Sequence, residues 1–420
     1  MSLAGLRVCV VALGDLGRSP RTLRHAAALL DCGATVDLVG YRGVPLPSGL
    51  AAHVQLRVHS FSGPRVSARH GLPRAAFIAY SAARVAAVSV RLATLLRRLP
   101  RPDLMLVQNP PALPTLAIAP PIAHWRKVPV VIDWHNFAYS QLGATLGKRS
   151  RFLKPARALE HALAHAEGHL CVSAAMREAL ADGWGIRAAT VLRDRPAAFI
   201  DPSRRQAARA RLGGLLGQPL DGANVPALVI SPTSWSADED SDLLLDALGR
   251  LEASADGNAP RVLCVLTGDG PRRAAFESAV ARRNWQRVAA RTLWLAPDEY
   301  PSLLSAADLG LCLHRSTSGV DLPMKIADLH GAGVPVCAFD YGPCLREMLS
   351  ETEAALGFTH AAGLATRLRQ ILNGFPLAPG LDVLRGVVAD QPQMTWAEGW
   401  RGEALPRLAA LMGRAPLDAQ

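Results

Sequence analysis

Short apolar runs alternate with amphipathic stretches along most of the chain. The first run is Leu6–Leu13, and a loop, a helix to about Leu30 and a second run, Thr35–Tyr41, follow it. This alternation predicts βαβ units and a parallel sheet. Further runs of the same kind occupy 104–107, 128–132, 169–172, 227–231, 262–267, 292–295 and 309–313.

The length of the chain and the spacing of these runs predict two domains. A chain of 420 residues is too long for one ordinary core. We expect an N-terminal Rossmann-like domain over 1–195, a linker over 196–226, where hydrophobic periodicity is absent, and a C-terminal Rossmann-like domain over 227–390. A final helix within 391–412 is expected to pack back on the first domain.

The loop after the first run contains Gly14, Asp15 and Gly17. A dinucleotide-binding fold would have GxGxxG here and an acid at the end of the second strand, which instead ends in Gly40-Tyr41. Both departures argue against a nicotinamide oxidoreductase. Asp15 lies where open α/β sheets bind ligands, but it could equally be a helix cap.

Polar residues also follow the run at 128–132, where the chain reads Asp133-Trp134-His135-Asn136. Residues at the carboxyl end of a strand are placed to meet a ligand. His135 is the best single candidate for a general acid, a general base or a hydrogen-bond donor to a phosphate. The alternative is a histidine whose hydrogen bonds are satisfied by the loop backbone.

The segment from 314 to 338 predicts a small-residue turn, a helix and a buried strand. We expect the turn to open the helix and to present N–H groups to an anion, as a diphosphate site requires; its residues are Ser316, Thr317, Ser318 and Gly319. Asp321 and Asp328 are seven residues apart, which places them on one helical face with Lys325 between them. The alternative is a first-turn acid followed by an exposed ion pair.

Three acids, Asp238, Asp240 and Asp242, precede the helix expected near 240–252. Their spacing imitates a metal-binding DxD motif. First-turn acids that complement the helix dipole explain them better.

The chain is basic, with 46 Lys plus Arg against 35 acids and a net charge of +11. This excess favours an anionic partner: a phosphate group, an acidic membrane surface or nucleic acid. Nucleic acid is disfavoured because the basic residues do not interleave with aromatic ones. The apolar stretch 74–98 carries Arg84, Arg91 and Arg98 on one face, so it is either a membrane-interface helix or a packing helix with solvated arginines.

The seven cysteines are scattered without a CxxC pair, which favours free thiols in a reducing compartment. The first apolar run, Leu6–Leu13, is too short for a signal peptide or a membrane span.

Two α/β halves that face a cleft at their strand ends make the GT-B architecture of glycosyltransferases the most economical fold. Several stretches are also similar to one family of such enzymes. The chain closely resembles the chitobiosyldiphosphodolichol β-mannosyltransferases over about residues 6 to 412. The segments that carry this resemblance are VVALGDLGRSPR, LVQNPPALP, VVIDWHNFAYS, SPTSWSADED, LTGDGP, HRSTSGVDLPMKIADLHG and MTWAEGW.

This resemblance implies an inverting transfer of mannose from GDP-mannose to GlcNAc2-diphosphate-dolichol. The second domain would bind the donor, with Asp328 and Lys325 at the ribose and Asp321 at mannose hydroxyls. The diphosphate would be held by Ser316–Gly319 together with Thr233 and Ser234. Gly268 and Gly270 would let the backbone pass close to the nucleoside.

The resemblance leaves two candidate bases for the acceptor proton, Asp15 and His135. Gly14, Gly17, Arg18 and Asn136 would lie on the phosphate and acceptor side. Arg18 and the helix dipoles would offset charge on GDP, so no coordinated metal is expected, although Mg²⁺ could assist.

The family usually has an N-terminal membrane span, whereas this chain starts directly at the first strand. We therefore expect peripheral attachment to the cytosolic face of the endoplasmic reticulum membrane, with other mannosyltransferases of the pathway as possible partners. Two alternatives stay open: another nucleotide-sugar hexosyltransferase with a lipid-linked or glycan acceptor, and a catalytically silent membrane scaffold.

Overall fold

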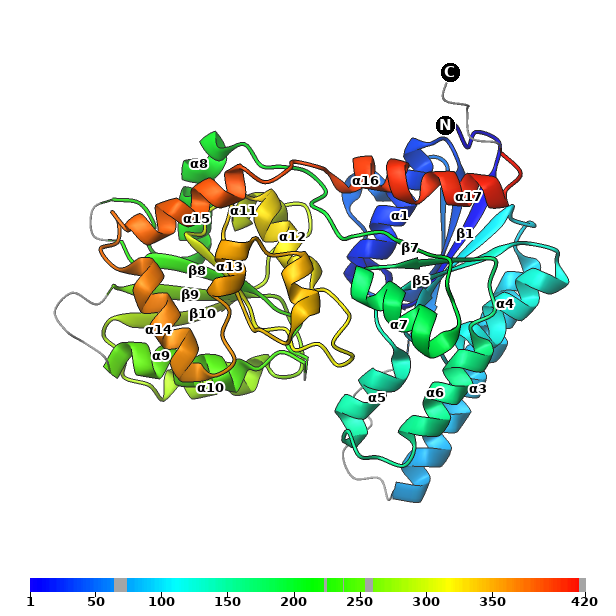
Figure 1. Ribbon diagram of the computed structural model, residues 1–420, viewed down its shortest axis with the longest axis horizontal. Helices are drawn as coiled ribbons and strands as arrows, with labels where there is room; N and C mark the ends of the chain where they lie inside the picture. Colours follow the sequence, from blue (N-terminus) through cyan, green and yellow to red (C-terminus); the bar gives the residue numbers. More distant parts are fainter. Residues whose placement is uncertain (64–73, 223–224, 237, 254–259, 415–420) are drawn as a thin grey trace. The chain divides into compact units, whose positions relative to one another are not determined.

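The computed structural model describes residues 1–63, 74–222, 225–236, 238–253 and 260–414. The chain divides into two compact units (Figure 1). Unit 1 comprises Met1–Arg193 and Ala397–Gln420, and unit 2 comprises Asp194–Trp396. Each unit is built on its own parallel sheet.

The sheet of unit 1 has seven strands in the order β3-β2-β1-β4-β5-β6-β7, all paired in parallel. The direction of winding reverses between β1 and β4, the point at which ligands bind in open α/β sheets. The strands are β1 (Arg7–Asp15), β2 (Thr35–Arg42), β3 (Leu56–Ser62), β4 (Leu104–Asn109), β5 (Val130–Trp134), β6 (Gly168–Cys171) and β7 (Ala189–Val191).

Helices connect these strands, as parallel pairing requires. Helix α7 shows the local rules: Ser173 caps its first turn by accepting a hydrogen bond from Met176 N–H at 2.9 Å, and Gly185 ends it in the left-handed conformation. The helices of this part are α1 (Pro20–Asp31), α2 (Ser48–Ala51), α3 (Arg74–Arg98), α4 (Thr115–Trp125), α5 (Ala138–Leu146), α6 (Leu153–Leu163) and α7 (Ala174–Trp184).

The end of the chain forms two helices, α16 (Trp396–Glu403) and α17 (Leu405–Leu411). From Ala397 onward it belongs to unit 1. Trp400 is buried and donates from Nε1 to Nδ1 of His25 on α1 at 3.0 Å. This bond joins residues 375 positions apart in the sequence.

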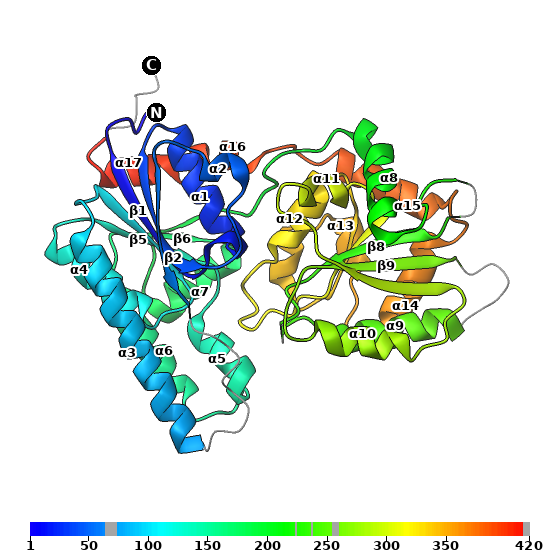
Figure 2. The ribbon, with the colours of Figure 1, turned by 180° about the vertical axis from the view of Figure 1, so that it is seen from behind.

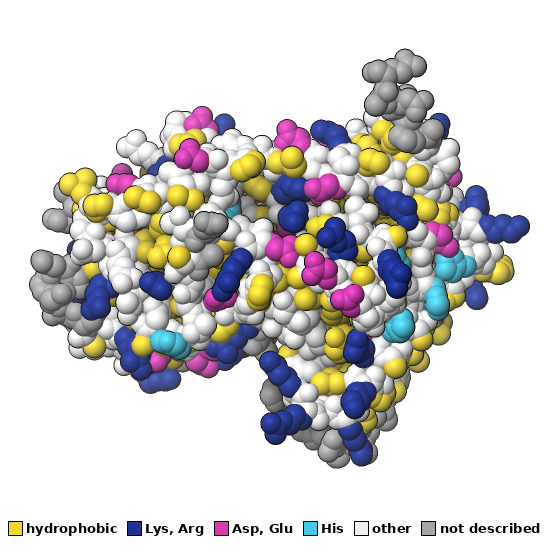
Figure 3. Space-filling model, viewed as in Figure 1, with side chains coloured by type: hydrophobic (Ala, Val, Ile, Leu, Met, Phe, Trp, Pro, Cys, Tyr) yellow, Lys and Arg dark blue, Asp and Glu magenta, His cyan; other side chains and the backbone are white. Residues whose placement is uncertain are grey.

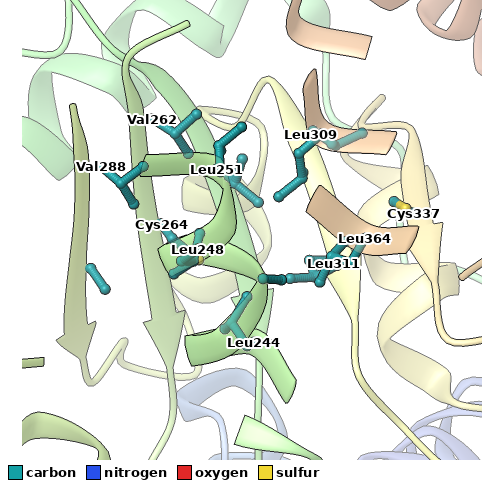
Figure 4. Packing of buried hydrophobic residues seen from close by; sticks show 14 of the residues in the cluster. Leu244, Leu248, Leu251, Val262, Cys264, Val288, Leu309, Leu311, Cys337 and Leu364 are labelled. Carbon is teal, nitrogen blue, oxygen red and sulfur yellow. The ribbon is translucent and has the colours of Figure 1, made fainter. Parts of the chain in front are cut away.

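The sheet of unit 2 has five parallel strands in the order β10-β9-β8-β11-β12, and its winding reverses between β8 and β11. Leucines of α9 pack with strand residues such as Val262 and Leu309 to form one apolar cluster (Figure 4). The strands are β8 (Ala227–Pro232), β9 (Val262–Thr267), β10 (Val288–Leu293), β11 (Leu309–Cys312) and β12 (Val336–Ala338). The helices are α8 (Arg205–Leu216), α9 (Ser241–Ala253), α10 (Arg273–Ala281), α11 (Tyr300–Leu304), α12 (Met324–Gly331), α13 (Glu351–Ala355), α14 (Ala361–Leu372) and α15 (Pro379–Ala389).

The linker expected over 196–226 is wrong for its central part, which forms helix α8 of unit 2. Ala208 and Leu212 of this helix are buried in an apolar cluster of the unit. Two arginines also face inward, because Arg205 and Arg209 donate to the buried carboxylate of Asp308 at 2.6 and 3.2 Å. These inward arginines hide the apolar periodicity of the helix from a reading of the sequence.

Candidate functional site

Two loops meet at the switch point of unit 2, one after β8 and one after β11. They are joined by an antiparallel bridge between Glu239 and His314, and Arg315 N–H donates to the carbonyl of Asp238 at 2.8 Å. Because neighbouring strands of a parallel sheet end at the same edge, the predicted donor residues of both loops come together here.

Glu239 is the centre of the first loop, although sequence reasoning assigned it no role. Its carboxylate is only 4% exposed and accepts from the N–H groups of Ser234 and Trp235 at 2.7 and 3.1 Å. The Thr233 hydroxyl and the Lys325 ammonium group also bond to it. Trp235 has a φ of +56°, an uncommon conformation for a residue with a side chain. The hydrogen bonds and the Lys325 ammonium group together compensate the buried charge of Glu239.

This arrangement changes the interpretation of Thr233 and Ser234, which were expected to hold a diphosphate. In the structure the Thr233 hydroxyl and the N–H and hydroxyl groups of Ser234 bond to Glu239. These donor groups therefore bind a carboxylate of the protein itself. Glu239 escaped notice because it stands among three aspartates that resemble first-turn acids.

Those three aspartates prove to have different roles. Asp240 caps α9 by accepting from Leu243 N–H at 2.9 Å, and Asp242 lies in the first turn of that helix, as the dipole argument expects. Asp238 is not a first-turn acid, because α9 begins at Ser241 and the Asp238 carboxylate instead pairs with His314. The loop must turn before the helix starts, which separates Asp238 from it.

His314 lies between two carboxylates. Its Nδ1 is 3.2 Å from Oδ2 of Asp238 and its Nε2 is 2.8 Å from Oδ2 of Asp321. Burial lowers the pKa of His314, but the hydrogen bonds and charges of Asp238 and Asp321 prevail and raise it to about 9. The imidazole is therefore a cation at neutral pH, and it ties the two loops together.

Asp321 is buried, and its carboxylate accepts hydrogen bonds from three side chains. Burial would raise its pKa, but the bonds from His314, Ser316 and Ser318 hold that pKa below its usual value. The Ser318 hydroxyl is 3.0 Å from Oδ1, and the Ser316 hydroxyl bonds to the same oxygen. Two of the hydroxyls expected at a diphosphate are thus bound to this carboxylate.

The helix of this segment starts later than the sequence predicts. Helix α12 begins at Met324, after Pro323 in an extended conformation, so Asp321 lies in the preceding loop. The prediction that Asp321 and Asp328 share a helical face is therefore wrong, and the turn of Ser316 to Gly319 does not open the helix. Leu322 and Pro323 are buried, which fixes the chain in this extended entry.

Lys325 and Asp328 are placed one turn apart on α12, as predicted. Lys325 is not one of an exposed pair, because its side chain is 17% exposed and bonds to Glu239. Burial lowers the pKa of Lys325 to about 8, against the opposing charges of Asp238 and Asp328. Asp328 is half-buried beside it.

Gly268 and Gly270, at the end of β9, pack against the loop that holds Glu239. A Cβ at Gly268 would lie 1.9 Å from the carbonyl oxygen of Thr233, and one at Gly270 would lie 2.2 Å from that of Ser234. Glycine is needed here for a close approach to the chain's own backbone. The Trp235 indole N–H donates to the Gly268 carbonyl at 3.2 Å.

In unit 1, Asp133 at the end of β5 anchors a buried charge cluster. Arg21 of α1 donates to both of its carboxylate oxygens, at 2.9 and 2.8 Å, and His25 lies 3.0 Å from Oδ2. Burial alone would raise the pKa of Asp133, but Arg21, His135 and His25 together hold it well below its usual value. Asp133 is therefore a permanent buried anion.

His135 reaches this anion and also faces solvent. Its Nε2 is 2.6 Å from Oδ2 of Asp133, and its side chain is 23% exposed. Because a carboxylate can only accept, Nε2 carries the proton, and a neutral His135 keeps its lone pair on Nδ1. No partner of Nδ1 is found within the described residues. This is the geometry of a general base with an orienting carboxylate.

Asn136 follows His135 but turns inward. Its Oδ1 accepts from Phe137 N–H at 2.7 Å and from the Ser140 hydroxyl at 3.1 Å, and the residue is 6% exposed. It thus shapes the entry of α5.

Asp15 acts as a cap in this structure. Its carboxylate accepts from Gly17 N–H at 3.1 Å and from Val44 N–H at 3.1 and 3.2 Å. The Arg18 guanidinium lies 3.7 Å away and is 44% exposed. Gly14 lies within β1, directly before this cap. Since the Asp15 carboxylate already serves the backbone, the geometry favours His135 of the two candidate bases.

Known proteins are similar to this chain in sequence, and solved structures are similar to it in fold. The Glycosyl transferase 4-like domain matches residues 17–193. The chitobiosyldiphosphodolichol β-mannosyltransferase of Mus musculus is 34% identical, over 95% of this chain and 88% of that protein. The human protein of the same name is also 34% identical, over 96% of this chain and 92% of its own. The chain belongs to this family.

As a member of the chitobiosyldiphosphodolichol β-mannosyltransferase family, the chain is a glycosyltransferase. An Arabidopsis thaliana relative called UDP-glycosyltransferase TURAN is 33% identical over 97% of this chain and 98% of that protein, so names within the family differ in the donor they suggest.

Solved glycosyltransferase structures confirm the predicted GT-B fold. Anabaena HepE in complex with UDP and glucose aligns with a TM-score of 0.64 and 16% identity, over 96% of this chain and all of that one. WaaG, a glycosyltransferase of lipopolysaccharide biosynthesis, aligns with a TM-score of 0.60 and 15% identity, over 97% of this chain and all of that one. At these identities the likeness concerns the fold alone.

Proposed function

We propose that the protein is an inverting β-1,4-mannosyltransferase that moves mannose from GDP-mannose to the 4-hydroxyl of the second GlcNAc of GlcNAc2-diphosphate-dolichol. The similarity to the mouse and human enzymes over almost the whole chain carries this proposal, because their names state a chitobiosyl diphosphodolichol acceptor and a β-mannosyl product. The cytosolic face of the endoplasmic reticulum membrane is the proposed location, and other mannosyltransferases of the pathway are the proposed protein partners.

Unit 1 would supply the base. Inversion needs one displacement: the acceptor oxygen bonds to C1 of mannose as the bond from C1 to the GDP oxygen breaks. The acceptor proton then passes to Nδ1 of His135, while Asp133 stabilises the imidazolium through Nε2. Support for this role comes from the 2.6 Å contact between His135 and Asp133 and from the solvent exposure of His135.

Unit 2 would bind the donor at the end of β8 and β11. Lys325 is the cation proposed to face the diphosphate, since its ammonium group is fixed by Glu239 and its side chain is 17% exposed. Asp328 is proposed to accept ribose hydroxyls, and Asp321 fixes the loop of Ser316 to Gly319 around the sugar. No metal is needed in this scheme, although Mg²⁺ could assist at the diphosphate.

A second candidate is a hexosyltransferase that uses a UDP-sugar, which the name of the Arabidopsis relative favours. The purified protein should be given a short-chain GlcNAc2-diphosphate lipid with GDP-mannose, UDP-glucose or both. We expect transfer from GDP-mannose, unaffected by excess UDP-glucose. Transfer from UDP-glucose alone would establish the second candidate, and no transfer from either donor would favour a silent scaffold.

The donor site has its own test. Asp328→Ala should abolish transfer, because the proposed ribose contact is lost. Asp246→Ala is a matched control, since Asp246 lies on α9 with 55% of its side chain exposed and pairs with Arg250 in the next turn. Equal turnover in the two variants would remove Asp328 from the donor site.

A further inference from the structure

Three helices of unit 1 expose apolar side chains to solvent. Helix α3 exposes Val85 and Val90, by 42% and 66%. Most of the described residues from 80 to 91 are also exposed. Leu146 at the end of α5 and Phe152 before α6 are about half exposed, at 49% and 48%. Soluble surfaces seldom gather large apolar side chains in this way without a partner.

These helices belong to one bundle. Helix α4 contacts both α3 and α6, and α6 contacts α5. Figures 1 and 2 show α3, α5 and α6 extending from the same end of the sheet of unit 1. We call the exposed side chains of 80–98 and 138–159 the helical surface.

The charge of the helical surface has one sign. Neither 80–98 nor 138–159 contains an Asp or Glu. Lys and Arg side chains gather over this part of the molecule (Figure 3). The basic residues of the two segments are Arg84, Arg91, Arg97, Arg98, Lys148, Arg149, Arg151, Lys154 and Arg157.

Basic groups are also held beside the aromatic rings of this surface. The Arg84 guanidinium lies 5.2 Å from the ring centre of Tyr80, and that of Arg151 lies 5.2 Å from the ring centre of Phe152. An apolar body with a cationic tip is the composition that the boundary between lipid headgroups and acyl chains accepts.

We propose that the helical surface docks unit 1 on an anionic lipid bilayer, with its apolar side chains at the acyl boundary and its arginines and lysines at the phosphate headgroups. Charge complementarity selects this partner, because two segments of 19 and 22 residues that contain no acid suit a continuous negative surface. No helix within the described ranges combines the length and the apolar character needed to cross a bilayer. The proposal rests on the surface alone and not on the sugar that is transferred.

The test is co-sedimentation of the full chain with vesicles of phosphatidylcholine, with or without about one third phosphatidylserine, a composition rich in anionic lipid. We expect at least tenfold tighter binding to the anionic vesicles, and loss of most of that difference at high salt. Equal binding to both vesicles, or no binding to either, would overturn the proposal.

Charge reversal locates the surface. The triple variant Lys148→Glu, Arg149→Glu, Arg151→Glu should bind anionic vesicles at least tenfold more weakly. A control with the same net charge reverses three exposed arginines of unit 2 instead: Arg211→Glu, Arg250→Glu, Arg282→Glu. Equal losses in both triple variants would show that net charge alone drives binding, which contradicts a docking surface.

The apolar part has a separate test. The double variant Val90→Ser, Phe152→Ser should lower vesicle binding severalfold while leaving its salt dependence unchanged. Unaltered binding would overturn the apolar contact and leave a purely electrostatic patch. Transfer to a short-chain, soluble acceptor should be the same in all these variants, so failure of docking can be told from failure of the proposed mannosyl transfer.

Discussion

The Asp238–His314–Asp321 triad makes the stability of unit 2 depend on pH. The pKa of His314 is about 9 in the folded protein and about 6.5 in an unfolded chain. Between these values the folded state holds a proton that the unfolded state has lost, so stability falls as pH rises. The contribution is fully present below pH 6.5 and amounts to about 3 kcal/mol over the whole window, at about 1.4 kcal/mol for each pH unit.

Half of this effect should be measurable between pH 6.5 and 8. Over that interval the free energy of unfolding should fall by about 1.5 kcal/mol relative to a His314→Asn variant, followed by urea denaturation. The comparison with the variant cancels the titration of the other histidines. The interval stops at pH 8 because Lys325, whose pKa is lowered to about 8, titrates from there upward and raises stability with pH. The variant would not cancel this effect, since Asp238, the partner of His314, also acts on Lys325.

The reasoning is refuted if the difference between the wild type and His314→Asn is constant from pH 6.5 to 8. A constant difference would mean that the folded and unfolded histidines bind their proton equally, and that His314 is not held as a cation between the two carboxylates.

Three further predictions follow from the buried charges of both units. Glu239→Gln should lower the free energy of unfolding by about 3 kcal/mol in a urea titration, because Lys325 loses its counter-charge. Glu252→Gln should cost less, because the Glu252 carboxylate accepts hydrogen bonds from the backbone N–H groups of Gln286, Arg287 and Val288. His135→Gln should lower kcat by roughly 10²- to 10⁴-fold with little change in GDP affinity, and an unchanged kcat would remove it as the base. Arg21→Met should destabilise unit 1 by about 3–5 kcal/mol, as it strips a bidentate partner from a buried carboxylate; a change below 1 kcal/mol would contradict the assigned geometry.

Much of the fold could be predicted from the sequence because the core strands are short, fully apolar runs. Strand β9 has the bounds that the run Val262–Thr267 suggests, and β4, β8 and β11 agree within two residues. Helix α8 was missed because its inner face contains Arg205 and Arg209, whose partner Asp308 is about a hundred residues away. No local pattern reveals such a partner.

The candidate site was predicted in position more than in detail. His135, Lys325 and Asp328 lie at strand ends or on the helix where the sequence places them. The partners of Thr233 and Ser316, which are Glu239 and Asp321, were not foreseen, because these contacts depend on how each loop folds back on itself. Glu239 could have been suspected from one signal: it is an acid directly before the cap of α9, where no helix-dipole role is left for it.

The central claim is that this chain makes a β-mannosyl linkage on a lipid-linked GlcNAc2 diphosphate. The most direct measurement is to incubate the purified protein with GDP-mannose and a short-chain acceptor, and to analyse the product by mass before and after digestion with β-mannosidase and with α-mannosidase. We predict the addition of one hexose that β-mannosidase removes and α-mannosidase does not. A product that only α-mannosidase shortens, or no product beside the active mouse enzyme, would contradict the account.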